Sequence, residues 1–235
     1  PYTPLFRSAD ARAAAQEAAA WIAERLRAAL AARGRARIAF SGGLSPRPML
    51  EALAALPLPW QDVDAFQVDE RVVRRHDAAR NLAMLVAALP QARWHPMPVD
   101  ALLDGERVPA AAARDYACLL EAQAGEPAVL DVVHLGLGED GHTASLFPGD
   151  AALDVLDADV VAVGERLGHS RMSCTLPLLS RARARAWLVT GVAKAPMLAA
   201  LLAGDARIPA ARVATTASVV FADAAAAGRT PRGEP

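Results

Sequence analysis

A glycine-rich segment near the middle of the chain carries the densest group of reactive side chains. Residues 136–149 read GLGEDGHTASLFPG, so two acids, Glu139 and Asp140, lie within three residues of the imidazole of His142. Glycines such as Gly138 allow the backbone to approach a ligand closely. An imidazole beside a carboxylate is suited to general base chemistry near neutral pH, whereas a histidine without such neighbours is more often structural or simply exposed. The combination makes His142 a candidate general base.

A short turn nearer the N-terminus is suited to holding an anion. The turn consists of Ser41, Gly42, Gly43, Leu44 and Ser45. It follows an apolar run and precedes a predicted helix, so its N–H groups and hydroxyls would face a ligand at a helix N-terminus, as in phosphate sites. The alternative is a tight connection that needs glycine only for its conformation. The turn matches neither the Walker loop nor the GxGxxG pattern.

Further charged residues could complete such a site. Asp69 and Arg71 flank Glu70 directly after an apolar run, where the simpler interpretation is a solvated turn with local ion pairs. Arg171 and Lys194, each typical of a surface cation alone, could close around a phosphate together with the Ser41–Ser45 turn. The five histidines show no HxxxH or HExxH spacing and the two cysteines do not group with them, so we expect no metal site.

Helical and strand patterns alternate along the chain. Helices are expected over residues 8–33 (capped by Ser8), 49–56, 81–89, 110–124 and 193–203, strands over 37–40, 63–68, 129–135, 159–163, 171–176, 186–190 and 212–215, and a long loop over 95–109. Apolar strands alternating with helices predict a mostly parallel sheet with helices on both faces. Ligands of such folds bind beyond the carboxyl ends of the strands. All three polar segments follow predicted strands, which favours one shared site.

Composition narrows the class of protein. The 235 residues are 54% hydrophobic and 22% charged, which excludes a disordered chain and leads us to expect one domain over residues 1–235, with 228–235 as a frayed tail. The formal charge of −1 offers no general attraction for nucleic acid or an anionic membrane. No membrane-spanning or signal segment is expected, and Cys118 and Cys174 are expected to be buried free thiols, so we expect a cytoplasmic protein.

The motifs together resemble those of the 6-phosphogluconolactonase family. They are the Ser41-Gly42-Gly43 turn, Asp69-Glu70-Arg71, Asn81, the segment 136–149, Arg171 and Lys194, in the family's order from about Phe6 to Phe221. The segment from His142 to Pro148 is highly specific, whereas the other motifs are weak alone. Two departures are Leu44, where the family has a hydroxyl residue, and Arg80, where a small residue usually precedes the asparagine.

The resemblance implies a Rossmann-like α/β fold related to glucosamine-6-phosphate deaminases. It implies a carboxylic ester hydrolase that converts 6-phospho-D-glucono-1,5-lactone to 6-phosphogluconate in the oxidative pentose phosphate pathway, without metal or cofactor. The related deaminases continue after the histidine with a Phe-Asn-Glu run, which Ala144 to Phe147 replace here, so lactone hydrolysis is favoured over deamination. A non-catalytic sugar-phosphate sensor is a third possibility. We expect a monomer or weak homodimer with no macromolecular partner.

In the mechanism that this family suggests, His142 takes a proton from water as it attacks the lactone carbonyl. Asp140 or Glu139 would orient the imidazole, and glycine-loop N–H groups or Arg71 would stabilise the oxyanion. Ser145 is the competing candidate as a nucleophile, although no GxSxG motif surrounds it. Ser41 to Ser45, Asn81, Gly138, Arg171 and Lys194 would bind the substrate and its phosphate.

Overall fold

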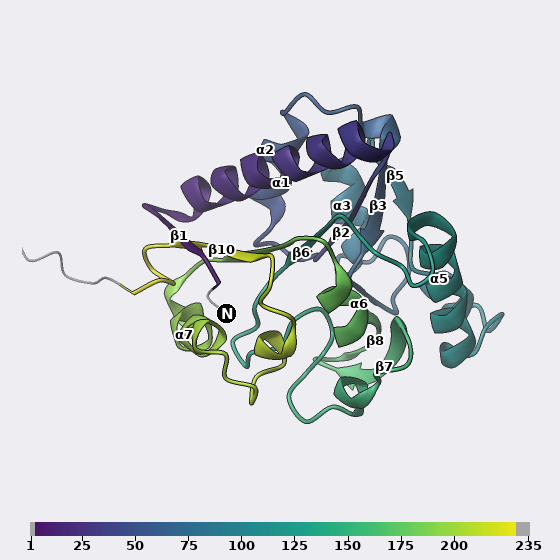
Figure 1. The fold of residues 1–235 in the computed structure, drawn as a ribbon. Helices are drawn as coiled ribbons and strands as arrows, with labels where there is room; N and C mark the ends of the chain where they lie inside the picture. The colour runs from purple at the N-terminus through teal and green to yellow at the C-terminus, as the bar shows by residue number, and fades with distance from the viewer. Residues whose placement is uncertain (1–2, 229–235) are drawn as a thin grey trace, which may run out of the picture.

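A seven-stranded parallel sheet forms the centre of the molecule (Figure 1), as seen in a computed structural model that describes residues 3–228. Most of the tail expected to fray, residues 229–235, lies outside the described residues. The strand order is β1-β10-β9-β6-β2-β3-β5. The strands are β1 (Leu5–Ser8), β2 (Ala36–Phe40), β3 (Val63–Gln67), β5 (Arg93–His95), β6 (Val132–Leu135), β9 (Arg185–Val189) and β10 (Ser218–Asp223). The predicted α/β class with a mostly parallel sheet is confirmed.

Helices cover both faces of this sheet (Figure 1). One face carries α1 (Ala11–Arg33), α2 (Arg47–Ala54) and α3 (Asn81–Ala88), and the other carries α5 (Pro109–Ala124), α6 (Leu176–Arg181) and α7 (Ala195–Ala203). A short helix, α4 (Val99–Leu103), and four single turns of 3-10 helix at Trp60–Asp62, Ala151–Asp154, Val192–Lys194 and Pro209–Arg212 complete the connections. Each face therefore has its own apolar core, and the sheet between them is buried on both sides.

The long first helix shows how local sequence sets an element. The side chain of Asp10 accepts a hydrogen bond from Ala13 N at 2.8 Å and caps the helix, so the expected cap at Ser8 is wrong: Ser8 ends β1 instead. Gly34, with φ of 70°, ends the helix with its N–H bonded to Leu30 O. Between these ends, one face rich in alanine is buried, and alanine lets the helix lie close to the sheet.

A second, three-stranded antiparallel sheet lies beside the main one. Its order is β4-β8-β7, with β4 (Asp69–Arg71), β8 (His169–Cys174) and β7 (Val160–Arg166). Asp69 pairs with Ser173, and Arg71 pairs with Arg171. This pairing, which local sequence patterns did not predict, brings two predicted site residues from distant parts of the chain face to face.

Several expected boundaries are wrong. Residues 212–215 form no strand: the 3-10 turn Pro209–Arg212 ends there, and the last strand, β10, begins six residues after Arg212. The expected loop over 95–109 contains α4, and the strand expected over 171–176 ends at Cys174 because α6 begins at Leu176. The edge strand β1 was not predicted, because a strand of only four residues next to a long helix shows too short a hydrophobic pattern to identify. No helix within residues 3–228 combines the length and apolar character needed to cross a membrane.

Candidate active site

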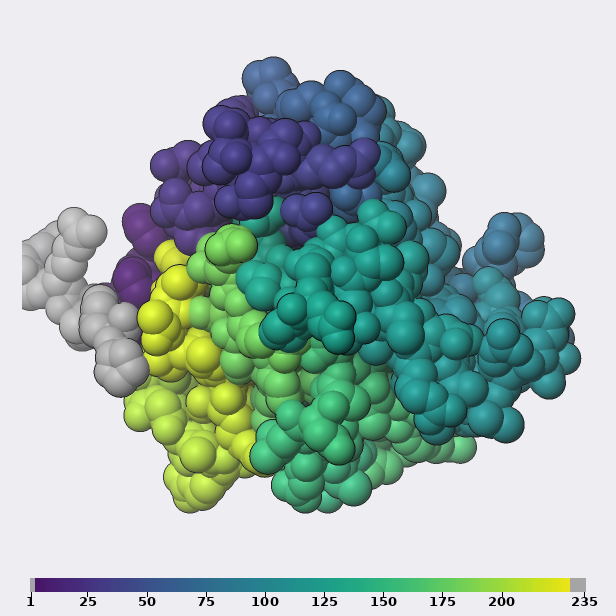
Figure 2. All heavy atoms as spheres, turned by 45° about the vertical axis from the view of Figure 1, so that its right-hand side comes forward, coloured from purple at the N-terminus to yellow at the C-terminus, as the bar shows by residue number. Residues whose placement is uncertain are grey.

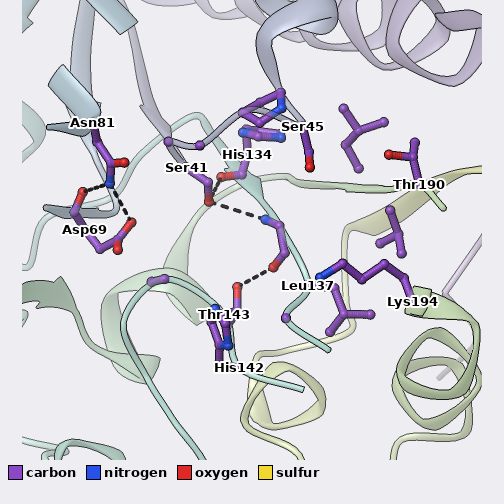
Figure 3. Close-up of a pocket in the computed structure, with 18 of the residues that line it drawn as sticks. Ser41, Ser45, Asp69, Asn81, His134, Leu137, His142, Thr143, Thr190 and Lys194 are labelled. Carbon is purple, nitrogen blue, oxygen red and sulfur yellow. Dashed lines mark hydrogen bonds between the residues drawn. The ribbon is translucent and has the colours of Figure 1, made fainter. Parts of the chain in front are cut away.

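A pocket of about 210 Å³ opens at the carboxyl ends of four neighbouring strands, β9, β6, β2 and β3 (Figure 3). The loops that follow these strands supply most of its lining, as expected for a parallel sheet. The predicted site residues that line it are Ser41, Gly42, Gly43, Ser45, Asp69, Arg71, Asn81, Gly138, His142, Arg171 and Lys194. The structure therefore brings most of the predicted site together in one place.

The imidazole of His142 is held by a carboxylate from its own loop. Its Nδ1 lies 2.5 Å from Oδ1 of Asp140, and its backbone N–H donates to the same oxygen at 3.0 Å. Although partial burial of Asp140 opposes ionisation, these hydrogen bonds and the attraction of an imidazolium lower the pKa of the carboxyl. Asp140 thus stays ionised near neutral pH and fixes the ring through Nδ1, which leaves Nε2 to exchange a proton with a ligand.

An aromatic ring supports the imidazole from one side. The rings of His142 and Phe147 lie 4.5 Å apart between centroids, and the guanidinium of Arg171 lies 5.5 Å from the centroid of Phe147. The phenyl ring therefore packs against both the imidazole and a guanidinium of the pocket. Phe147 was not among the predicted site residues, although its place in the segment 136–149 was a signal.

Gly138 makes room for this arrangement. A Cβ atom added there would lie 2.1 Å from Nδ1 of His142 and 2.6 Å from Oδ1 of Asp140. The same holds in the Ser41–Ser45 turn, where a Cβ on Gly42 would lie 2.2 Å from the side-chain amide of Asn81. Both glycines are therefore needed because a side chain approaches the backbone closely.

Hydrogen bonds join the turn after β2 to the loop after β6 (Figure 3). The hydroxyl of Ser41 donates to His134 O at 3.1 Å and accepts from Gly136 N at 3.3 Å, while the hydroxyl of Thr143 donates to Gly136 O at 2.9 Å. Ser41 thus ties two loops together, and Ser45 keeps its hydroxyl at the pocket. Leu44, which stands where the family has a hydroxyl residue, is 85% exposed and points into solvent. The absence of a hydroxyl at this position therefore leaves the pocket wall intact.

Asp69 lines the pocket and is held by contacts to the side chains around it. Its Oδ2 accepts a hydrogen bond from the buried hydroxyl of Ser145 at 2.7 Å and lies 4.0 Å from the guanidinium of Arg171. Its backbone carbonyl accepts from the amide of Asn81 at 3.1 Å (Figure 3). Burial lowers the pKa of Arg171, an effect that Asp69 partly offsets. The carboxylate therefore lies among donors rather than in free solvent.

Glu70, by contrast, is buried outside the pocket lining and holds neighbouring backbone in place. Its carboxylate accepts hydrogen bonds from the backbone N–H groups of Arg71, Asn81 and Leu82 at 2.8–2.9 Å. Since Asn81 and Leu82 are the first residues of α3, Glu70 caps the N-terminus of a helix that begins 11 residues later in the chain. Burial raises the pKa of Glu70 despite these bonds, and the buried guanidinium of Arg80 lies 3.2 Å away. Arg80 also forms a two-pronged ion pair with Asp100, which explains how an arginine fits before Asn81.

Replacing Glu70 with alanine should therefore destabilise the fold. The change removes the cap of α3 and leaves a buried guanidinium without this partner, and breaking a buried ion pair costs about 3–5 kcal/mol. Urea unfolding of Glu70→Ala and of Glu51→Ala measures the effect. Glu51 pairs with Arg47 on an exposed helix surface at 2.9 Å, where such pairs contribute under about 1 kcal/mol. Equal losses in the two variants would contradict the supporting role of Glu70.

Two further cations, Arg71 and Lys194, line the pocket, and an acid lies beside one of them. The ammonium of Lys194 lies 3.8 Å from Oε1 of Glu139, so this acid points toward the lysine while Asp140 contacts His142. The guanidinium of Arg71 lines the pocket and donates to Ala79 O at 2.7 Å. Of the two carboxylates considered for orienting the imidazole, Asp140 is the one that the structure places against it.

Other residues at the pocket were not predicted. Thr190 directly follows β9, so the rule that ligands lie beyond strand ends could have identified it. His134 lies beneath the Ser41 turn with a buried ring, and burial lowers its pKa to about 3, so the ring is neutral. Within residues 3–228, no three metal-ligating side chains gather closely enough to hold an ion.

Comparisons with known proteins show the family to which the chain belongs. The family model described as glucosamine-6-phosphate isomerases/6-phosphogluconolactonase matches residues 9–221. A 6-phosphogluconolactonase of Synechocystis is 39% identical over 191 residues, covering 79% of each chain, and one of Pseudomonas putida is 39% identical over 208 residues, covering 84% of this chain and 82% of the other. The crystal structure of a 6-phosphogluconolactonase from Shewanella baltica, 27% identical, superposes with a TM-score of 0.81 over 94% of this chain and 97% of that one. The chain therefore belongs to the glucosamine-6-phosphate isomerase/6-phosphogluconolactonase family.

Proposed function

We propose that this protein hydrolyses 6-phospho-D-glucono-1,5-lactone to 6-phosphogluconate without a metal or cofactor, with His142 as the general base. The observation that carries the proposal is a single pocket with two distinct walls. One wall holds an imidazole fixed by Asp140, and another holds Lys194 and the Ser41–Ser45 turn. A substrate with a carbonyl near one end and a phosphate at the other fits this arrangement.

The phosphate end supplies binding energy and orientation. N–H groups of Gly42 and Gly43, the hydroxyl of Ser45 and the ammonium of Lys194 are the donors available there. Arg171 adds a second positive charge deeper in the pocket. Binding of the remote phosphate orients C1 of the lactone against His142, and this orientation lowers the activation free energy of hydrolysis.

In the chemical step, water forms a bond to C1 and the C1–O5 bond breaks, and the imidazole of His142 carries the proton between the two oxygens. Water attacks C1 as Nε2 of His142 takes its proton, which forms a tetrahedral oxyanion. Arg71 or N–H groups of the glycine loop stabilise that charge. The C1–O5 bond then breaks, the ring oxygen receives the proton from the imidazolium, and the product is a carboxylic acid that ionises to 6-phosphogluconate. Asp140 holds the imidazolium while it forms.

Ser145 fits a positioning role better than that of a nucleophile. Its hydroxyl is fully buried and already donates to Asp69 at 2.7 Å. A serine that attacks a carbonyl needs open space for the substrate and a base such as an imidazole to accept its proton, but the hydroxyl of Ser145 is bonded to Asp69 and not to the imidazole of His142. Direct attack by water is therefore the mechanism that we propose.

Replacing Lys194 with alanine should raise the KM for the lactone about tenfold or more while kcat stays within about twofold. The ammonium acts on the phosphate, and a hydrogen bond to a charged group contributes about 1.5–3 kcal/mol. Steady-state kinetics of Glu139→Gln provide the matched comparison, because this change removes the acid beside Lys194 and should lower KM. A lower kcat with an unchanged KM in Lys194→Ala would contradict the assignment.

Turnover assays with two substrates separate the proposed reaction from that of the related deaminases. We expect the lactone to be hydrolysed and glucosamine 6-phosphate to remain unchanged, because Ala144 to Phe147 lack the later glutamate. Ammonia release from glucosamine 6-phosphate would favour deamination. Binding of both sugar phosphates without turnover of either would favour a sensor.

A further inference from the structure

A second hollow, of about 460 Å³, lies at the opposite edge of the main sheet from the active site. Its floor is formed where β6, β9 and β10 begin, and helix α1 forms one wall. Small side chains, Ala28 and Ala29 on the helix and Ala184 and Ala217 before the strands, leave the space open. Figure 2 shows α1 in purple meeting the C-terminal part of the chain, in green and yellow, on one face of the molecule.

Two aromatic rings line this groove. Phe6 of β1 stacks on Phe221 at 5.2 Å between centroids, and it remains 46% exposed. Trp21 of α1 meets Phe221 edge-on at 6.1 Å. Because Phe221 covers only one face of Phe6, the other face is available to stack on a flat ligand.

Positive charge dominates the rest of the lining. The guanidinium groups of Arg33 and Arg183 both approach Oδ1 of Asp131, at 2.5 and 3.4 Å. A third arginine, Arg25, lies over the ring of Trp21 at 4.8 Å. Asp131 is buried and neutralises one charge of the three arginines that line the groove, and Arg25 also lies 3.4 Å from the exposed carboxylate of Glu24. Guanidinium groups held beside one another present several N–H donors suited to a phosphate.

We propose that this groove binds an anion that carries a flat ring, of the nucleoside phosphate class. The ring would stack against Phe6 and Trp21, and the phosphate would lie between Arg33 and Arg183. Aromatic walls combined with a few convergent charged groups are typical of small-molecule sites. The inference does not depend on the reaction at the other edge, since the two pockets share no residue.

Titration calorimetry with ADP tests the proposal on the full chain. We expect a Kd below about 1 mM for ADP, and binding at least about fivefold weaker for adenosine, which lacks the phosphate, and for ribose 5-phosphate, which lacks the ring. Saturating 6-phosphogluconate should not displace ADP from the groove. Displacement would place ADP in the active site and overturn the proposal.

Substitutions in the groove test whether ADP binds there. Arg183→Gln should weaken ADP binding about fivefold or more, and Trp21→Leu should do the same by removing the stacking surface. Arg107→Gln is the matched control, because Arg107 is equally exposed (54% against 56%), also pairs with one aspartate, and lies far along the chain between α4 and α5. Lactone hydrolysis by Arg183→Gln at the wild-type rate would verify folding. No heat of binding up to about 5 mM ADP, or equal affinity in Arg183→Gln and Arg107→Gln, would refute the site.

Discussion

Replacing His142 with alanine should lower kcat for lactone hydrolysis by about 10²–10⁴-fold and leave KM nearly unchanged. Proton transfer by a positioned side chain contributes an acceleration of that size. The effect falls on kcat because the imidazole is fixed by Asp140 through Nδ1, whereas in the proposed function the phosphate is bound by other residues of the pocket, Lys194 and the Ser41–Ser45 turn. Removal of the base therefore leaves a site that still binds substrate but no longer activates water.

Steady-state kinetics of His142→Ala, His76→Ala and the unaltered protein make the comparison. His76 is exposed in the segment after β4, so its removal should change neither constant. A His142→Ala variant that kept kcat and lost affinity would show that the imidazole binds substrate instead of accepting a proton. The general base would then have to be another group of the pocket, with Asp69 the first to examine.

Adding one methyl group at Gly138 should be nearly as harmful as removing the base. The new Cβ would lie 2.1 Å from Nδ1 of His142 and 2.6 Å from Oδ1 of Asp140, far inside contact distance, so the imidazole and the carboxylate that holds it must both shift. A displacement of about 1 Å at a reacting group costs about 10²-fold in rate. We therefore expect Gly138→Ala to lower kcat about 10²-fold while the protein stays folded.

Gly136→Ala is the matched control, since it lies two residues away in the same loop and a Cβ there meets nothing within 4 Å. Kinetics and thermal unfolding of both variants separate a local effect from loss of the fold. Similar losses of kcat in both variants would mean that the loop backbone, and not the approach of His142 to Gly138, is responsible.

The location of the site could be predicted from the sequence because it depends on local order along the chain. Turns that follow parallel strands meet at one sheet edge, so Ser41, Asp69 and Gly138 could be placed together before their distances were known. Thr190 directly follows β9, so the same rule places it at the site.

Other features depend on pairings that local patterns do not contain. Arg171 reaches the site because β8 pairs with β4 in a separate antiparallel sheet, over a separation of about 100 residues. Two adjacent acids differ in role because neighbouring side chains in a tight loop point apart: Asp140 meets His142 and Glu139 meets Lys194. Glu70 likewise caps α3 across the chain, which its triplet alone did not indicate.

Lactone hydrolysis is tested most directly by following 6-phosphogluconolactone, generated in situ, by NMR with and without the protein. Spontaneous hydrolysis sets the baseline, and we expect the unaltered protein to remove the lactone signal well above that baseline while 6-phosphogluconate appears in equal amount. Lactone loss at the spontaneous rate with the folded protein present would contradict the proposed function.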